Sequence, residues 1–324
     1  MRTIFFLIFL FTFPCLFAQA TNNINAEIKD SVIKHHNRID DIASEKEIET
    51  LLVMIDEKYK NFRVNNPIDY KYGFKDKSDT ECRYFNDSLK PRPWVRVDFD
   101  GNGYTDLLVI GWRYNHSVIC ILDRGENNFY IKTITRRSFQ ECTFPIVSVI
   151  DDNPIILYYS INEANWFSDK FKKFLKADTL VFRFGDFVEF NSKPAQHKIE
   201  KIEYKTGGCY GTCPIFSLTI DPNRKAIFTA TKYNKRKGKY FATIDTSSFN
   251  QLIGIINYID FETLRSNYKV NWTDDQDCSL KITYDGGKTK VIDDYGLIGT
   301  FGLNRTYRIL FRLRENQKWK RKWI

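Results

Sequence analysis

Residues Asp98–Ile110, which read DFDGNGYTDLLVI, carry the clearest structural signal in the chain. Oxygen ligands occupy positions 1, 3, 5, 7 and 9 of a cation-binding loop: Asp98, Asp100, Asn102, the Tyr104 carbonyl and Asp106. Gly101 and Gly103 permit the tight, partly left-handed backbone that wraps such a loop around an ion. The apolar run after Asp106 predicts a buried strand.

Three of these side chains are carboxylates, which repel one another at short range. A hard divalent cation such as Ca²⁺ relieves that repulsion, because it prefers oxygen ligands. We therefore predict a structural Ca²⁺ site at this loop. The alternative is an ordinary turn of Asp, Gly and Asn residues that holds no ion.

Short strands surround the loop and predict a β-rich N-terminal region. They are expected at residues 94–98, 107–110, 118–122, 129–133, 144–150, 155–159, 179–184 and 187–190. Helices are expected over residues 24–62, where Ser44 and Glu47 can form a capping box, and over residues 163–176. Residues 21–195 are thus predicted to form N-terminal helices and an antiparallel β-rich domain.

A second, smaller domain is expected over residues 196–316, after a linker at residues 191–196. Its periodicity predicts the element order β-β-β-β-α-β-β-α, which makes the fold class α+β. The expected strands are residues 199–205, 215–220, 225–232, 239–244, 279–284 and 289–293, and the expected helices begin near residues 246 and 302. Residues 317–324 form a basic tail, expected to be solvated and frayed; contact with anionic lipid or polysaccharide is the alternative.

The first twenty residues have the pattern of an export signal. Arg2 precedes the apolar run Ile4–Phe17, and Ala18–Ala20 forms a small-residue cleavage site. A membrane anchor is the alternative, but the apolar run is short for a span. We expect a secreted or periplasmic protein with signal peptide 1–20 and no transmembrane segment.

Composition agrees with an exported protein and narrows the function classes. Removing residues 1–20 takes away one basic residue and one cysteine, so the net charge falls from +9 to +8 and six of the seven cysteines remain. An even number suits an oxidising compartment. The chain lacks a phosphate-binding glycine loop, a zinc pattern and a nucleic-acid motif. Its histidines have no neighbouring nucleophile, and His35 and His36 are expected at the surface.

Cys209 and Cys213 lie in the sequence GCYGTCP, whose glycines and proline predict a turn. An extended chain would hold their Cα atoms about 13 Å apart, beyond the roughly 7 Å limit of a disulfide, so the turn is required for pairing. We predict a structural disulfide. A redox-active dithiol is the alternative, although catalytic pairs have two intervening residues at a helix start.

The remaining cysteines leave their pairing open. Cys82 and Cys142 flank the strand region and can pair, Cys120 is expected as a buried free thiol, and Cys278 has no obvious partner. Further acidic residues are expected at turns: Asp274, Asp275, Asp277, Asp293 and Asp294. A second cation site at the first three of these is the alternative.

The stretch DFDGNGYTDLLVIG resembles the single-repeat Ca²⁺ loop of integrin-type (FG-GAP and VCBS) β-propeller repeats. An EF-hand fits less well, because Val109 would stand where that motif needs a bidentate Glu. The motif occurs once, whereas a propeller needs several blades. The resemblance therefore implies the loop and its cation, and not the propeller.

A second resemblance covers residues 199–316. The segments Gly207–Ile220, Trp272–Asp275 and Val291–Gly296 resemble an uncharacterised domain family with a GCYGTCP signature, found in secreted and envelope proteins of Gram-negative bacteria. The proline usual after the Thr-Asp pair is replaced here by Gln276-Asp277. This resemblance implies a domain boundary and no specific activity.

Together these patterns predict a secreted or envelope-associated, non-enzymatic binding protein of two domains, stabilised by Ca²⁺. Its partner is expected to be a protein or glycan at the cell envelope. The alternative is a hydrolase, or a hydrolase inhibitor, with its site at the domain junction. Exposed aromatic residues such as Trp112, Trp166 or Trp319 would favour binding, whereas a cleft with adjacent carboxylates or a histidine would favour the enzyme.

Overall fold

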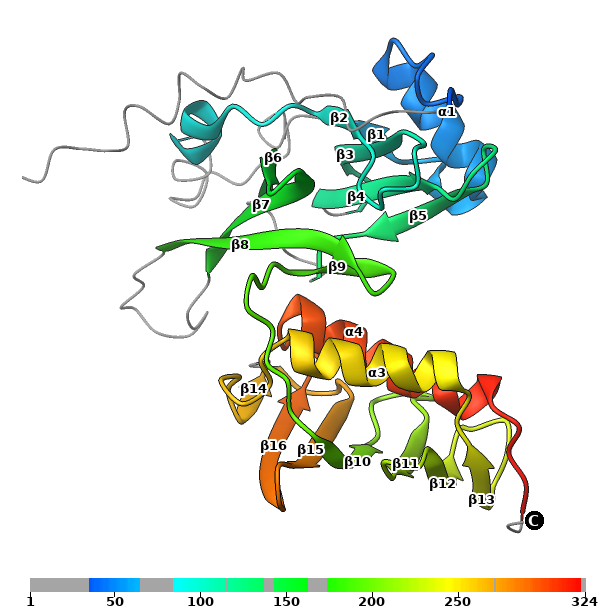
Figure 1. Ribbon diagram of the computed structural model, residues 1–324. Helices are drawn as coiled ribbons and strands as arrows, with labels where there is room; N and C mark the ends of the chain where they lie inside the picture. Colours follow the sequence, from blue (N-terminus) through cyan, green and yellow to red (C-terminus); the bar gives the residue numbers. More distant parts are fainter. Residues whose placement is uncertain are drawn as a thin grey trace, which may run out of the picture.

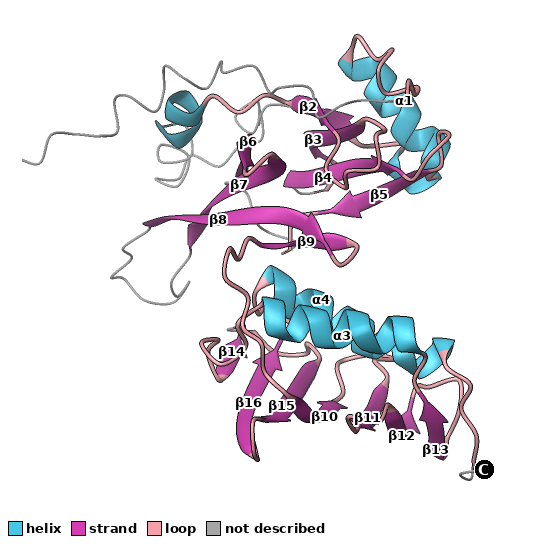
Figure 2. Ribbon diagram, in the orientation of Figure 1, coloured by secondary structure: helices cyan, strands magenta, loops and turns pink. Residues whose placement is uncertain are grey.

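A computed structural model describes residues 35–64, 84–114, 116–136, 143–162, 174–270 and 272–321 (Figure 1). Helices and antiparallel sheets occur together, which confirms the α+β class (Figure 2). Several predictions lie outside the described residues: the signal peptide, the pairing of Cys82 with Cys142, Trp166, and most of the helix expected at residues 163–176. No helix among the described residues is long and apolar enough to cross a membrane.

The first helix is shorter than the sequence predicted. The predicted capping box at Ser44 and Glu47 begins α1 (Glu45–Ile55), and η2 (Glu57–Tyr59) follows it. Residues 35–43 instead form a bridge and turns, so the expected helix over residues 24–62 is wrong in this part. The cause is local competition: Asp40 accepts the N–H of Asn37, whose own side chain accepts the N–H of Ile39.

The first sheet surrounds the predicted buried strand. In the described part of the chain its strands are β1 (Arg63–Val64), β2 (Trp94–Val97), β3 (Asp106–Trp112), β4 (His116–Asp123) and β5 (Phe129–Thr133). Leu107 and Val109 of β3 pack on the α1 side, and Leu108 packs on the opposite side with the second sheet. Burial on both faces explains why this strand is apolar without alternation.

The second sheet joins β6 (Thr143–Ile150), β7 (Asn153–Asn162), β8 (Phe174–Arg183) and β9 (Asp186–Glu189) in sequence order. The predicted hairpin at Gly185 connects β8 to β9. One side of this sheet packs on the first sheet through Ile156, Leu180 and Phe187. Val188 belongs instead to the core of the C-terminal region, so this sheet is covered on both sides.

The C-terminal region is a seven-stranded sheet with two helices on one face (Figure 1). Its order, β13-β12-β11-β10-β15-β16-β14, comprises β10 (Ile199–Thr206), β11 (Ile215–Ile220), β12 (Lys225–Lys232), β13 (Gly238–Thr243), β14 (Asn267–Lys269), β15 (Asp277–Tyr284) and β16 (Lys288–Tyr295). The helices are α3 (Thr246–Tyr258) and α4 (Phe301–Asn316). Strand β14 was not predicted, because three residues parallel to β16 give no periodic signal.

The helices α3 and α4 lie between the C-terminal sheet and the β8–β9 hairpin (Figure 1). Glu189 accepts the N–H groups of Phe301 and Gly302, which begin α4. The expected linker 191–196 contains no helix or strand, and Asn191 at its start is hydrogen-bonded to Tyr258 of α3. The two predicted domains are therefore packed against each other.

The described part of the basic tail, residues 317–321, packs on the fold, which corrects the solvated, frayed segment expected from its composition. Trp319 is 8% exposed, packs against Phe228 and donates its indole N–H to the Leu313 carbonyl. Lys320 exchanges two backbone hydrogen bonds with Phe241 of β13. Indole burial and the edge-strand pairing offset the charge repulsion that suggested a solvated end.

Candidate functional site

The acidic loop connects β2 to β3, where Val97 and Asp106 are register partners. Carboxylate oxygens of Asp98, Asp100 and Asp106 lie within 4.8 Å of one another. Asp98 is 3% exposed and Asp106 is fully buried. Among the described residues, this is the only group of three or more His, Cys, Asp or Glu side chains close enough to share an ion.

Asp98 organises the backbone of the loop. One of its oxygens accepts the N–H groups of Gly101 and Asn102 at 2.8 and 3.2 Å, and the other accepts the N–H of Gly103 at 2.8 Å. Gly101 and Gly103 have φ angles of +71° and +86°, as predicted from the need for a left-handed path. The loop therefore closes around a carboxylate.

Asp106 joins the loop to the neighbouring β4–β5 turn. Its oxygens accept the N–H groups of Phe99 and Asp123, each at 2.9 Å. Burial, reinforced by the charges of Asp100 and Asp98, raises the pKa of Asp106 to about 8. Burial and the Asp98 charge also raise the pKa of Asp100. The cluster thus favours a bound proton or cation at neutral pH.

The side chains of Asn102 and Tyr104 make hydrogen-bonding and stacking contacts of their own. The Asn102 side-chain oxygen accepts the N–H of Tyr104 at 2.8 Å, and its amide nitrogen donates to the Asp123 carbonyl at 2.6 Å. Tyr104 stacks on His35 with ring centroids 4.8 Å apart. The three predicted carboxylate ligands thus lie together, and the Asn102 side chain is turned toward the β4–β5 turn.

Two segments that the sequence did not connect with the site hold the loop in place. Asp123 is fully buried, and its carboxylate accepts the N–H groups of Gly125 and Asn127. From the N-terminal side, Asp40 accepts the hydroxyl of Thr105 at 2.6 Å. Strands β3 and β4 separate Asp123 from the loop along the chain, so sequence spacing does not reveal their contact.

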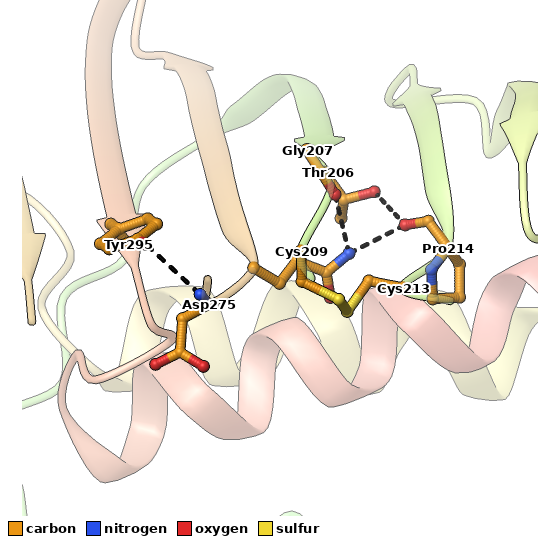
Figure 3. Close-up of a disulfide and its surroundings, with 8 residues drawn as sticks. Thr206, Gly207, Cys209, Cys213, Pro214, Asp275 and Tyr295 are labelled. Carbon is orange, nitrogen blue, oxygen red and sulfur yellow. Dashed lines mark hydrogen bonds between the residues drawn. A yellow bond between two sulfur atoms is a disulfide. The ribbon is translucent and has the colours of Figure 1, made fainter. Parts of the chain in front are cut away.

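The predicted disulfide between Cys209 and Cys213 is confirmed, with Cα atoms 5.7 Å apart (Figure 3). Gln276 closes the turn by donating to the carbonyls of Gly207 and Pro214 at 3.0 and 2.9 Å. A Cβ atom at Gly207 would lie 1.8 Å from a carboxylate oxygen of Asp277, so any other residue there would displace that exposed side chain. Gln276 therefore has a structural role in this turn.

The remaining cysteines and aspartates separate into buried and turn positions. Cys120 and Cys278 are buried and unpaired, as predicted for Cys120. Asp274 has a left-handed φ of +77°, and Asp275 accepts the indole N–H of Trp272 at 2.6 Å, so both serve the turn before β15. Asp277 is the first residue of β15, in agreement with its expected position at the start of a strand, whereas Asp293 and Asp294, predicted as turn residues, lie within β16.

The junction between the second sheet and α4 contains a buried ion network. Asp186, 3% exposed in its side chain, lies 2.6 Å from Lys132 and 3.3 Å from Arg308. Burial lowers the pKa of Lys132 to about 8, even though the nearby Asp186 charge acts in the opposite direction. Asp186 is thus paired with two cationic side chains, and Glu189 accepts the N–H groups at the start of α4. Both carboxylates at this junction therefore have structural partners.

Comparison with known proteins adds one finding. Residues 200–314 match the model of a family described as a domain of unknown function (DUF6438). The matched residues include β10 through most of α4 and the disulfide turn. No curated protein and no solved structure gives a significant match to the chain.

Proposed function

We propose that the protein is an exported, non-enzymatic binding protein whose N-terminal region is stabilised by Ca²⁺. The observation that carries the Ca²⁺ assignment is the grouping of Asp98, Asp100 and Asp106 within 4.8 Å, with two of the three buried. Buried like charges are unfavourable unless a counter-charge compensates them. A hard dication with oxygen ligands is the counter-charge that suits three carboxylates.

The ion would have a structural role. Asp98, Asp100 and Asp106 would supply the protein oxygens, because a carboxylate oxygen that accepts one N–H retains a lone pair for a cation. Its charge would hold the β2–β3 loop against the β4–β5 turn, to which Asp106 and Asn102 are already hydrogen-bonded. The Asn102 side chain and the Tyr104 carbonyl remain predicted ligands, reachable if the loop adjusts around the ion.

The expected stabilisation is modest. Extracellular Ca²⁺ modules have dissociation constants of roughly 10⁻⁴ to 10⁻³ M. At 1 mM Ca²⁺, a site with a dissociation constant of about 10⁻⁴ M adds about 1.4 kcal/mol to the free energy of unfolding. That amount orders one loop and leaves the sheets to be held by their apolar cores.

Thermal unfolding with Ca²⁺ or with a chelator tests this assignment through Asp100→Asn. Among the hydrogen bonds described, Asp100 accepts one, from the N–H of Asn102, and an asparagine oxygen retains it. We expect wild-type Tm to rise with Ca²⁺ and the variant Tm to be insensitive to it. The matched control is Asp221→Asn at the exposed β11–β12 turn, which should retain the full response. An equal Tm response to Ca²⁺ in both variants would contradict the assignment of a Ca²⁺ site to the acidic loop.

The binding role rests on exposed aromatic residues beside the disulfide turn. Tyr210 is 89% exposed, Trp272 is 48% exposed, and the N–H of Tyr210 donates to the Asp274 carbonyl in the turn that carries Trp272. Aromatic rings on a covalently closed turn offer a pre-ordered contact surface for a protein or glycan. The predicted Trp319 is instead buried, so the candidate face is this turn.

A photo-crosslinking amino acid at position 210 tests this face in cells that produce the full chain. We expect it to capture a discrete partner, and a crosslinker at Tyr114, which is 68% exposed in the N-terminal region, to capture none or a different set. Identical adducts from both positions would show that the disulfide turn is not a specific contact surface.

A further inference from the structure

The positive charge of the chain is concentrated at one end of the C-terminal sheet. Residues 232–239, between β12 and β13, and residues 314–321, at the end of the described chain, together contain nine basic residues and one acidic residue, a net charge of +8. The rest of the chain has 40 basic and 39 acidic residues and is nearly neutral. We call these two segments the basic end.

The fold brings the two segments together. Lys320 is hydrogen-bonded to Phe241 of β13 through both backbone groups, at 2.7 and 2.9 Å. Arg314 of α4 reaches the Asn234 side chain at 3.4 Å, and Lys235 lies 3.5 Å from Glu315. Figure 1 shows the end of the chain beside β13, at the edge of the sheet. Cations separated by about 80 residues thus share one surface.

A cavity of about 130 Å³ lies where the segments meet, lined by Phe228, Asn234, Lys235, Arg236, Arg314 and Glu315. The Arg314 guanidinium lies over the rings of Phe216 and Phe311, 5.5 and 5.7 Å from their centroids, which fixes its position. Its Nε atom is buried and has no hydrogen-bond partner. Glu315 is shared between Lys235 and Arg314, so the cavity retains excess positive charge and an unused donor.

We propose that the basic end docks on a membrane surface rich in anionic lipids, with a phosphate headgroup bound against Arg314 in the cavity. Clustered lysines and arginines bind such surfaces electrostatically, and a projecting hairpin allows several of them to reach one plane. Tyr233, 56% exposed within the hairpin, is an amphipathic side chain of the kind enriched at the membrane interface. An alternative role for these lysines is to protect the edge strand from aggregation. That role would explain neither the cavity nor the second basic segment.

Vesicle sedimentation of the full chain tests the proposal. The vesicles contain either phosphatidylcholine alone or one quarter phosphatidylglycerol, and a chelator excludes Ca²⁺ bridging. We expect binding to the anionic vesicles only, with loss at 1 M NaCl. The triple variant Lys235→Ser, Arg236→Ser, Lys237→Ser should bind about one hundredfold more weakly. The control Lys60→Ser, Lys193→Ser, Lys288→Ser removes equal charge from exposed positions elsewhere and should bind within about threefold of wild type.

The arms of the experiment separate the alternatives. Arg314→Lys keeps the charge but loses the planar donor, so it should weaken binding to the vesicles that contain phosphatidylglycerol while Tm stays close to wild type. Equal weakening by both triple variants would overturn the basic end as the docking surface. Binding to soluble dextran sulfate without binding to vesicles would overturn the lipid assignment in favour of a polyanion. Because chelator is present throughout, neither outcome depends on the proposed Ca²⁺ site.

Discussion

Two loops of this protein are closed by different interactions: the acidic loop between β2 and β3, and the disulfide turn between β10 and β11. Both connect adjacent antiparallel strands through irregular backbone. The acidic loop directs its backbone N–H groups at Asp98 and Asp106, which concentrates negative charge in a buried place. The disulfide turn is closed by a covalent bond. The neutral side chain of Gln276 donates hydrogen bonds to its carbonyls, so neither contact involves a charged group. We therefore expect the first loop to respond to cations and the second to reductants.

The two loops also differ in what surrounds them. The acidic loop is hydrogen-bonded to two other segments, around Asp40 and Asp123. A substitution in the loop should therefore also disturb the packing of the first sheet. The disulfide turn is exposed at Gly208 and Tyr210–Thr212, and it is hydrogen-bonded to the turn before β15 and to Asp277 at the start of β15. Substitutions in the acidic loop should consequently have the larger effects on stability.

The largest effect is expected for Asp106→Ala. The change leaves the buried N–H groups of Phe99 and Asp123 without their acceptor, and each such group costs about 1–3 kcal/mol. We expect the free energy of unfolding to fall by about 3 kcal/mol in chelator, measured by denaturant titration. Asp221→Ala, which removes an exposed turn acceptor, should cost less than half as much. Equal losses of stability in the two variants would show that Asp106 contributes no more than an ordinary turn acceptor.

A smaller effect is expected for the double substitution of Cys209 and Cys213 by serine. A five-residue closed loop contributes about 2 kcal/mol on the chain-entropy estimate. The variant should lose about that amount, and a reductant should lower the stability of the wild-type chain but not that of the variant. Its response to Ca²⁺ should match the wild type. A diminished Ca²⁺ response would mean that the two loops are coupled, against the comparison drawn above.

The smallest effect is expected for Gln276→Ala. The change removes two donors to the carbonyls of Gly207 and Pro214, and because the turn lies near solvent, water can replace them. We expect a loss of about 1 kcal/mol and faster amide exchange at residues 207–214, measured by hydrogen–deuterium exchange. Gln251→Ala, which removes a single donor to the Phe184 carbonyl, is the control and should leave exchange in the turn unchanged.

Local chemistry explains which predictions succeeded. The left-handed glycines of the acidic loop, the capping box at Ser44 and the turn that joins Cys209 to Cys213 each involve residues within a few positions of one another. Strand and helix periodicity similarly reports on burial of one segment at a time. The helix expected over residues 24–62 was wrong at residues 35–43, because Asn37 and Asp40 satisfy backbone groups in a turn that periodicity does not detect.

The sequence by itself determined the α+β class, the ligand spacing from Asp98 to Asp106 and the disulfide turn, because these depend on neighbouring residues and on alternation along one strand. Only the tertiary structure placed Asp123 beside the acidic loop, buried Trp319 and brought the tail to the β12–β13 hairpin. These contacts join residues far apart in the chain, and their energies depend on shared burial. A list of residue types does not contain that information, since it takes folding to make distant side chains neighbours.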